Sequence, residues 1–428
     1  MCKVETKTCD MASPTATSTL QLAPEDEWIA KVDLKAFGDE MRELGKTLRE
    51  AQGPADDEHL YKLIRWQAGL TLAGLLTMWM TPNPFTVICL STGLFMRWAM
   101  LAHHVCHNGY KNTDAGKKHG YNQFIFAVGS LVRRIVDWAD WIYPEAWNLE
   151  HGRLHHYNLN EATDPDVVEL NSEYLRESGY PTPVKYMVIF FFGLTWKWSY
   201  YAPNTYSALL QSRRARELEL TGDEKAKEAL AKERLAIRHM TVFSMFDDSA
   251  PSWWSNYSFL TNVVLPFVIL RFVVTPLPVF VLMGASAYQN AIINLLLAEL
   301  LTNLHSFLAI VPNHAGDDMY FFDTHCKALS DEFYLRQVVG SVDFQVGNDF
   351  IDTFHGFLSY QIEHHLWPDL SMLSYQKAHP LVKDICRKHG VPFVQHSVFH
   401  RLYKTINIFM GYEQMRLFPQ EALKTTES

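Results

Sequence analysis

Long apolar blocks alternate with charged stretches along this chain of 428 residues. A helix that crosses a bilayer needs roughly 20 mostly apolar residues. Blocks that approach this length occur at residues 63–80, 84–102, 184–202, 259–283 and 287–311. The first two are separated by the short uncharged link Thr81-Pro82-Asn83, so they predict a helical hairpin. The pattern therefore indicates an all-α membrane protein with large water-exposed parts.

Basic residues flank this hairpin on both sides. Lys62 and Arg65 lie at its start, and Lys111, Lys117 and Lys118 follow it. Because positive charge favours the cytosolic side, both ends of the hairpin are expected in the cytosol.

The block 184–202 differs from the other apolar blocks. It contains Lys185 and Lys197 and is rich in Trp and Tyr, which is typical of a segment at the membrane interface. Block 259–283 contains Arg271 and a Pro-Leu-Pro sequence, which predicts a kinked or a partly re-entrant segment. With 184–202 assigned to the membrane surface, the count is four transmembrane helices.

The remaining chain is divided as follows. Residues 1–60 form a polar tail, disordered up to residue 25, and a soluble lead-in helix; 61–400 form the membrane domain, and 401–428 a cytosolic tail. Residues 211–238 are rich in Arg, Glu, Lys and Ala, with opposite charges such as Glu224 and Lys227 spaced for a solvated helix.

Composition excludes several classes of protein. The net charge is -9 and there is no basic stripe interleaved with aromatic residues, which argues against a nucleic-acid partner. The six cysteines include no C-x-x-C pair, so neither a disulfide framework nor an oxidising compartment is indicated. The first sixty residues contain no apolar core of a signal peptide.

Clustered histidines are the main chemical feature. Two positions four apart share one face of an α-helix, as in H-x₃-H. The three clusters contain His103 and His107; His151, His155 and His156; and His364 and His365. If the clusters form one site, an even number of crossings must separate the second from the third. The same parity puts His314, at the end of the last apolar block, beside them as a candidate eighth ligand.

Other polar residues near the clusters are candidates for orienting the ligands. Gln361 lies one helical turn before His364, and we expect it to hydrogen-bond to a ligand rather than to bind metal itself. Turn formation and helix capping are the alternative roles for several of these residues. The candidates are Glu150, Asn158, Asp164, Asp166 and His104. His305 is expected to be a buried, hydrogen-bonded histidine with a possible role near the metal, whereas His239, His389 and His396 are expected on the surface.

Seven or eight imidazoles exceed what one tetrahedral metal ion needs. Imidazole binds iron, copper, zinc and nickel. Iron activates O₂ and zinc does not, and an O₂-activating site beside a bilayer suggests attack on an unactivated C–H bond of a lipid, for which the metal must supply the oxidant. Two iron ions are therefore the expected cofactor.

The three clusters, with Q-I-E-H-H-L-W-P at 361–368, resemble the histidine boxes of membrane fatty acid desaturases, and Gln361 resembles the front-end branch. The resemblance covers about residues 60–400. It implies a diiron enzyme that uses O₂ and two electrons to form a carbon–carbon double bond in an acyl chain. It also implies four transmembrane helices with a helical cytosolic cap and a kinked substrate tunnel. The implied catalytic iron ligands are His103, His107, His151, His155, His156, His364 and His365, and His314 matches a further ligand.

One departure from the family affects the expected partners. Many front-end enzymes carry a fused cytochrome b5 domain with a His-Pro-Gly-Gly motif, whereas His379-Pro380 lacks the glycines. Electrons from NAD(P)H are then expected through a separate carrier, either cytochrome b5 with its reductase or ferredoxin. The substrate is an acyl-lipid or acyl-CoA, and the endoplasmic reticulum is preferred over a plastid or bacterial inner membrane. A hydroxylase or acetylenase, or a non-catalytic membrane lipid-binding protein, is the alternative.

Overall fold

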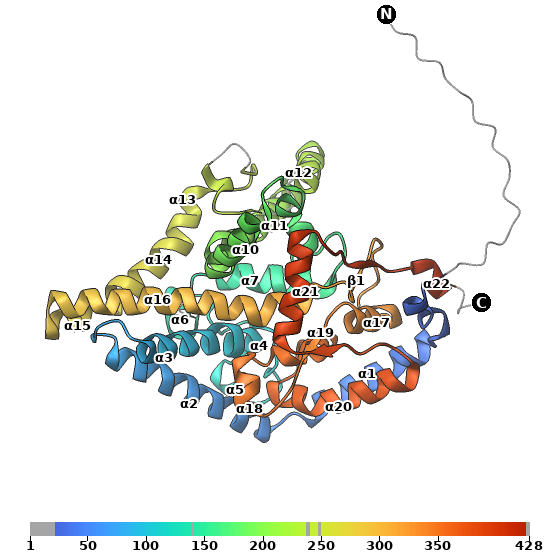
Figure 1. Cartoon of the computed structure of the whole chain (residues 1–428), viewed down its shortest axis with the longest axis horizontal. Coiled ribbons are helices and arrows are strands. Elements are labelled where there is room, and N and C mark those ends of the chain that lie inside the picture. The colour runs from blue at the N-terminus through green and yellow to red at the C-terminus, as the bar shows by residue number, and fades with distance from the viewer. Residues whose placement is uncertain (1–21, 139, 237–239, 247–249, 425–428) are drawn as a thin grey trace, which may run out of the picture.

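The computed structural model describes residues 22–138, 140–236, 240–246 and 250–424. It is almost entirely helical, as the apolar pattern predicts (Figure 1). The first 21 residues of the tail predicted to be disordered up to residue 25, together with Cys2, Cys9 and His239, fall outside these residues. Residues 22–25 are described, and a 3₁₀ turn begins at Pro24, so the prediction of disorder is wrong there. The four cysteines that are described are buried and unpaired, in agreement with the absence of a disulfide framework.

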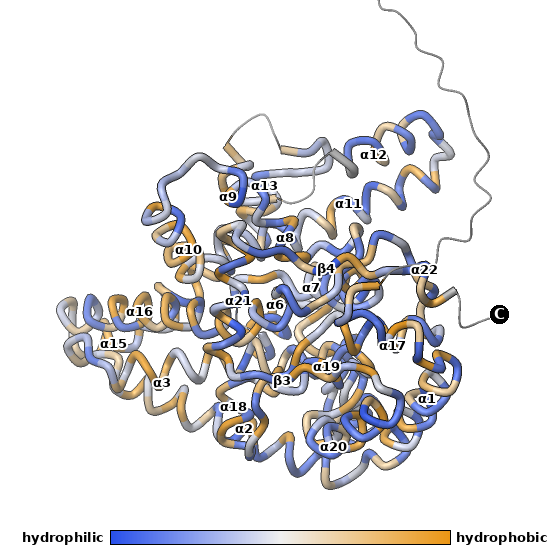
Figure 2. Tube along the Cα trace, turned by 45° about the vertical axis from the view of Figure 1, so that its right-hand side comes forward, coloured by the Kyte–Doolittle hydropathy of each residue, from blue (hydrophilic) through white to orange (hydrophobic). Residues whose placement is uncertain are grey.

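Three continuous helical segments are long and apolar enough to cross a membrane. These segments are Pro84–Cys106, Asn256–Met283 and Ala285–His314. The first comprises α3 (Pro84–Phe95), a π-helical turn (Met96–Ala102) and α4 (His103–Cys106). The second comprises α13 (Asn256–Phe259), α14 (Leu265–Val268), α15 (Leu277–Met283) and π-helical turns between them. The third is α16 (Ala285–Ile310) followed by a 3₁₀ turn (Val311–His314). Figure 2 shows the apolar positions concentrated along α3 and α16 and polar positions on α12 (Glu224–Ala236).

The expected hairpin is present, but its first helix is more polar than a typical span. Helix α2 (Pro54–Thr77) runs antiparallel to α3, and glycine permits the close approach: a Cβ on Gly74 would lie 2.6 Å from the Leu90 side chain. The turn between the helices is held on α16, where the Asn294 amide donates to the carbonyls of Met78 and Met80, both at 3.0 Å. Helix α2 is not among the three span candidates, so the predicted count of four crossings is not confirmed.

Block 184–202 does not lie flat beside the bundle. Helix α10 (Thr182–Trp196) packs antiparallel on the last third of α16: Trp196 donates to the Asn303 carbonyl at 2.8 Å, and Phe192 contacts Phe307. A π-helical turn (Lys197–Tyr201) then continues the helix without a break into α11 (Ala202–Thr221), with right-handed helical backbone at both junctions.

A buried ion network fixes the π-helical turn that follows α10. Lys197 is fully buried, and its ammonium lies 2.9 Å from Asp140 and 3.9 Å from Glu299 of α16. Glu299 also pairs with Arg271 of the preceding span at 2.7 Å. Two cations and two carboxylates balance, which is the condition under which buried charges are tolerated.

The charged stretch at 211–238 forms parts of two helices rather than one. Helix α11 ends at Gly222, whose φ of 69° is readily adopted by glycine, and α12 follows. The expected pair between Glu224 and Lys227 is present at 2.8 Å.

The remaining helices form a cap over one end of the spans (Figure 1). Their bounds are α1 Leu34–Ala51, α5 Asp114–His119, α6 Leu131–Arg133, α7 Pro144–Leu149, α8 Val168–Asn171, α9 Glu173–Glu177, α17 Asp331–Val339, α18 Asp349–Phe354, α19 Gln361–Leu366, α20 Met372–His389, α21 Val398–Met410 and α22 Gln420–Lys424. Two short parallel ladders join distant segments: β1 (Tyr320–Phe321) with β4 (Arg416–Leu417), and β2 (Asp343–Phe344) with β3 (Gln395–His396).

Candidate metal centre

The first histidine cluster follows a π-helical turn at the end of a span. The backbone N–H of His103 reaches back to the carbonyl of Trp98, five residues earlier; His103 begins α4, and His107 follows the last residue of that helix. The two rings lie 5.0 Å apart and both are buried. Such π-helical turns inside helices occur often at functional sites.

The second cluster is itself π-helical, between Glu150 and His155. The N–H of His156 bonds to the carbonyl of His151, which places these two residues one turn apart. In an α-helix only His151 and His155 would share a face. The wider turn brings His156 onto that face as well, and its ring lies 4.9 Å from that of His151.

The third cluster lies on the short helix α19, which is completely buried. Two contacts with α1 hold the segment that follows it. Arg49 forms paired hydrogen bonds to Asp369 at 2.8 to 3.0 Å, and Gly45 packs on the Trp367 ring. The lead-in helix expected from the sequence thus supports the third cluster directly.

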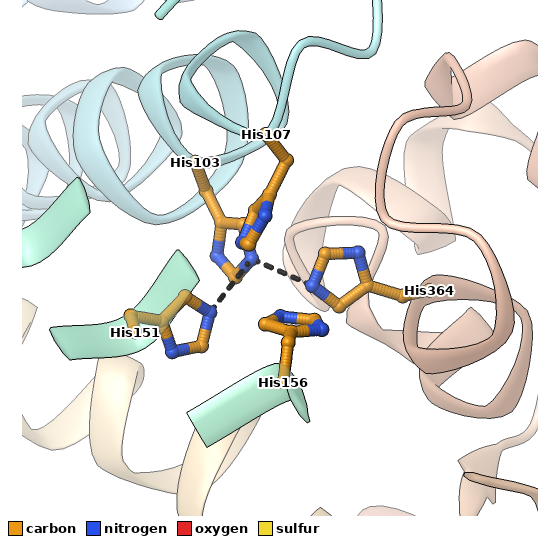
Figure 3. A group of neighbouring side chains, drawn as sticks. All are labelled: His103, His107, His151, His156 and His364. Carbon is orange, nitrogen blue, oxygen red and sulfur yellow. Dashed lines mark hydrogen bonds between the residues drawn. The ribbon is translucent and has the colours of Figure 1, made fainter. Parts of the chain in front are cut away.

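The structure brings all of these histidines together in two adjoining groups. The larger contains His103, His107, His151, His156 and His364, whose rings converge on one point (Figure 3). The smaller contains His155, His314 and His365. The rings of His156 and His365 stack 4.4 Å apart across the boundary between the groups. Two candidate metal positions, rather than one, agree with the seven or eight histidine ligands counted in the sequence.

The chemistry of the cluster fits bound metal. Ring nitrogens that are buried without a hydrogen-bond partner occur on His107, His151, His155, His156, His314 and His365. Nε2 of His103 lies 2.9 Å from Nε2 of His364 and 3.3 Å from Nε2 of His151. Burial, followed by the neighbouring imidazoles, lowers the pKa of His107, His151, His156, His364 and His365 well below its usual range. Neutral rings with free lone pairs are the form that metals bind.

His155 differs because a carboxylate faces it. Its Nδ1 lies 2.9 Å from Oδ1 of Asp164, as the sequence suggested. Burial opposes protonation, but this carboxylate outweighs it and raises the pKa of His155. Two more acids are close: burial and Asp166 raise the pKa of Glu150 well above normal, and burial raises the pKa of Asp166 to about 6.

The other residues predicted to orient the ligands fall into two sets: some lie beside the histidine groups and others lie away from them. Gln361 lies beside the smaller group, with its amide nitrogen 2.9 Å from Nε2 of His314. His104 is buried next to the larger group and bonds to the Met100 carbonyl at 2.7 Å. His305 instead bonds to the Phe354 carbonyl and stacks on Phe95, in agreement with the hydrogen-bonded role favoured for it. Asn158 bonds only within its own turn, to Leu154.

Sequence reasoning missed several residues that contact the cluster. Trp147 stacks on His151 at 4.6 Å and touches His103 and His107; its position four residues before His151 was an available signal. The Tyr375 hydroxyl lies 3.2 Å from Nδ1 of His364, and no spacing rule connects α20 to α19.

A buried triad behind the third cluster was also missed. Nδ1 of His379 lies 3.0 Å from Asp343 and 3.1 Å from Glu363, the residue that precedes His364. Asp343 also accepts the backbone N–H of Ile362 at 2.8 Å. Burial opposes a charged ring, but hydrogen bonds to the two carboxyls outweigh it and raise the pKa of His379 to about 9.

An apolar cavity of about 700 Å³ reaches both groups of histidines. His151, His155 and His314 line its inner part, and α10 and the turn after it supply most of one wall, including Phe192, Trp196 and Tyr201. An elongated apolar molecule is therefore the kind of ligand this cavity suits.

The fold and site together define a helical membrane protein with a two-centre, all-histidine site beside an apolar cavity. The family model described as fatty acid desaturase matches residues 78–397, and the chain belongs to this family. The family resemblance predicted from the three histidine boxes is thereby confirmed.

Individual relatives match over shorter regions. The sn-1 linoleoyl-lipid 6-desaturase of Arthrospira platensis is 33% identical over 86 residues, covering 20% of this chain and 23% of that protein. The Delta(8)-fatty-acid desaturase 1 of Arabidopsis thaliana is 32% identical over 95 residues, 22% of this chain and 20% of the relative. The Delta(5) fatty acid desaturase A of Dictyostelium discoideum is 25% identical over 134 residues, which cover 30% of this chain and 27% of that protein. These matches span about a quarter of the relatives' length or less, and they agree with the front-end type.

The triad around His379 predicts a stability that falls at high pH. A pKa raised from about 6.5 in the unfolded chain to about 9 contributes stability that is complete below pH 6.5 and is lost as the pH rises through 9. We expect His379→Gln to remove this part of the pH dependence and to cost about 3 kcal/mol near neutral pH, because two buried carboxyls lose their partner. Thermal unfolding in detergent between pH 6 and 10 measures both effects. His400→Gln, at an exposed site, is the control; equal pH profiles for wild type and His379→Gln would contradict the assignment.

Proposed function

We propose that this protein is a diiron acyl desaturase that uses O₂ to introduce a carbon–carbon double bond into a fatty acyl chain. The observation that carries the proposal is the pair of adjoining histidine groups at the inner end of the apolar cavity. Membership of the desaturase family agrees with it.

In this proposal the larger histidine group holds one iron and the smaller group holds the other. Bound together, the two irons activate O₂ and supply the oxidant that removes two hydrogens from neighbouring carbons. The protein's own groups fix the rings: Asp164 holds Nδ1 of His155, the Tyr375 hydroxyl holds Nδ1 of His364, and Gln361 is oriented toward His314. Such contacts set ring orientation and strengthen the ligand.

The acyl chain would lie in the cavity with one methylene pair beside His151, His155 and His314. The walls are aromatic and aliphatic, so they favour the chain and exclude water from the site of oxidation. We further propose that electrons come from NAD(P)H through a separate carrier, cytochrome b5 with its reductase or ferredoxin, and that the protein resides in the endoplasmic reticulum.

We also propose that α2 is a fourth crossing. A helix that packs antiparallel along a span, as α2 does along α3, traverses the same apolar layer, and its outer face exposes Leu72 and Leu76. Both ends of the α2–α3 hairpin and the cap then lie on the cytosolic side.

Cysteine labelling in sealed vesicles tests this topology. In a background with Cys2→Ser and Cys9→Ser, an impermeant thiol reagent should reach Lys225→Cys, on α12, from the cytosolic side only. Thr81→Cys, in the turn between α2 and α3, should react only from the opposite side. Reaction of both from the same side would rule out the fourth crossing.

Metal analysis tests the diiron assignment. The purified protein is expected to contain two irons per chain, and His156→Ala, at the boundary of the two groups, should contain fewer because a vacant ligand position weakens the site. His400→Ala, on the surface, should keep two. Zinc in place of iron, or a single ion in the wild type, would contradict the proposal.

Product analysis tests the reaction. In a host that lacks the activity, expression should yield an acyl chain with one new double bond, and His155→Ala should reduce the product to background at equal protein level. His400→Ala serves again as the control. A product that gains an oxygen atom would indicate a hydroxylase, a new triple bond an acetylenase, and no product with both irons bound would refute the desaturase proposal.

A further inference from the structure

The cavity is enclosed at its histidine end and open at the other. The inner residues His155, Trp196 and Phe409 are at most 7% exposed. At the outer end, Tyr174 and Phe243 are 76% and 74% exposed and Val188 is 41% exposed. These three residues, from α9, the segment after α12 and α10, define what we call the mouth.

The antiparallel packing of α10 on α16 fixes the level of this mouth. Trp196 lies beside Asn303, and Phe192 beside Phe307. Val188, one turn earlier on α10, therefore lies near Ile310 and Val311, which line the same cavity where α16 ends. The mouth thus opens where the last span leaves the apolar layer of the bilayer.

The surface around the mouth is apolar and aromatic. Met187, Phe190 and Phe191 on the outer face of α10 are more than half exposed. The hydroxyls of Tyr174 and Tyr180 hydrogen-bond to each other at 3.1 Å beside the opening. Tyrosine at the level of the lipid headgroups, next to apolar side chains, is typical of a surface that contacts membrane lipid.

Charge at the opening discriminates between carriers of the acyl chain. No Lys or Arg is among the described residues that line the cavity, and its one carboxyl is Asp166. Two basic residues nearby are already engaged: Lys185 donates to the Arg176 carbonyl, and Arg176 pairs with Glu169. An acyl-CoA would bring several phosphate charges to this opening, where the described residues that line the cavity supply no cation to receive them, and phosphate recognition depends on such groups.

Resting on the proposed desaturase function, we infer that the substrate is an acyl chain still esterified to a membrane lipid, which enters laterally from the bilayer, and not a soluble acyl-CoA. The headgroup stays at the interface beside Tyr174 and Tyr180. The acyl chain passes Val188 and Phe243 and ends beside the histidines.

A pulse experiment in expressing cells tests this inference without choosing an electron donor. Cells are given labelled saturated and monounsaturated fatty acids, and phospholipid and acyl-CoA pools are separated at short intervals. We expect the new double bond first in phospholipid, and in acyl-CoA only later. Its earlier appearance in acyl-CoA would overturn the inference while leaving the desaturase function intact. No new double bond in either pool would overturn the proposed function, and this inference with it.

Substitutions at the mouth give a second measurement. Tyr174→Ala with Phe243→Ala should lower phospholipid desaturation by roughly tenfold, which corresponds to about 1.4 kcal/mol, while iron content stays at the wild-type value. Phe399→Ala removes an aromatic ring that is 81% exposed and lies outside the cavity lining, so it should change neither quantity. Unchanged lipid desaturation in the double variant, with product in both pools, would argue against entry at this mouth.

Discussion

The structure depends on one constraint, which is that many neutral imidazoles must remain buried side by side with their lone pairs directed to two neighbouring points. A buried nitrogen without a partner is costly, and protonating one ring among so many would be costlier still. The arrangement is favourable only if cations occupy the places where the nitrogens converge. Metal binding and folding of the cap are therefore expected to be coupled, because the ligands come from four separate segments of the chain.

The surrounding contacts hold those segments against one another. The first histidine cluster follows directly from a span, and the second is held by Asp164 and Trp147. The third cluster lies between α1 and the His379 triad, which both contact it or the residues that follow it. Most of these contacts are made by charged side chains that lie on the side of the imidazole rings away from the metal positions. They are buried and paired with a ring nitrogen or with one another, so they fix the orientation of the ligands. In the bundle, the ion pairs of Lys197 and Glu299 fix the π-helical turn after α10 in the same way, and this helix walls the cavity.

Much of this could be predicted from the sequence because the signals were local. Apolar length located the three spans to within a few residues, and the histidine spacing identified the members of both groups. Parity added His314, which spacing alone could not. What the sequence could not supply was geometry that depends on tertiary contacts. No sequence pattern predicts the π-helical turn that brings His156 onto the same face as His151. Tyr375 and Asp343 come close to the third histidine cluster only when α20 and β2 have packed against it. Block 184–202 was expected at the membrane surface, and its antiparallel packing on α16 follows from contacts with Asn303 and Phe307, which lie more than a hundred residues away.

Helix α10 and the π-helical turn after it connect the histidine site with the surface around the cavity opening. The turn is fixed by the charge of Lys197, the inner face of α10 borders the histidines, and its outer face is apolar and exposed. Because the charge of Lys197 is paired with Asp140 and Glu299, this end of the segment stays buried in protein, whereas Phe190 and Phe191 remain exposed on the outer face. Exposed apolar side chains beside the end of a span favour contact with lipid over contact with water. The same helix therefore supplies both an inner wall of the cavity and the apolar surface around its opening.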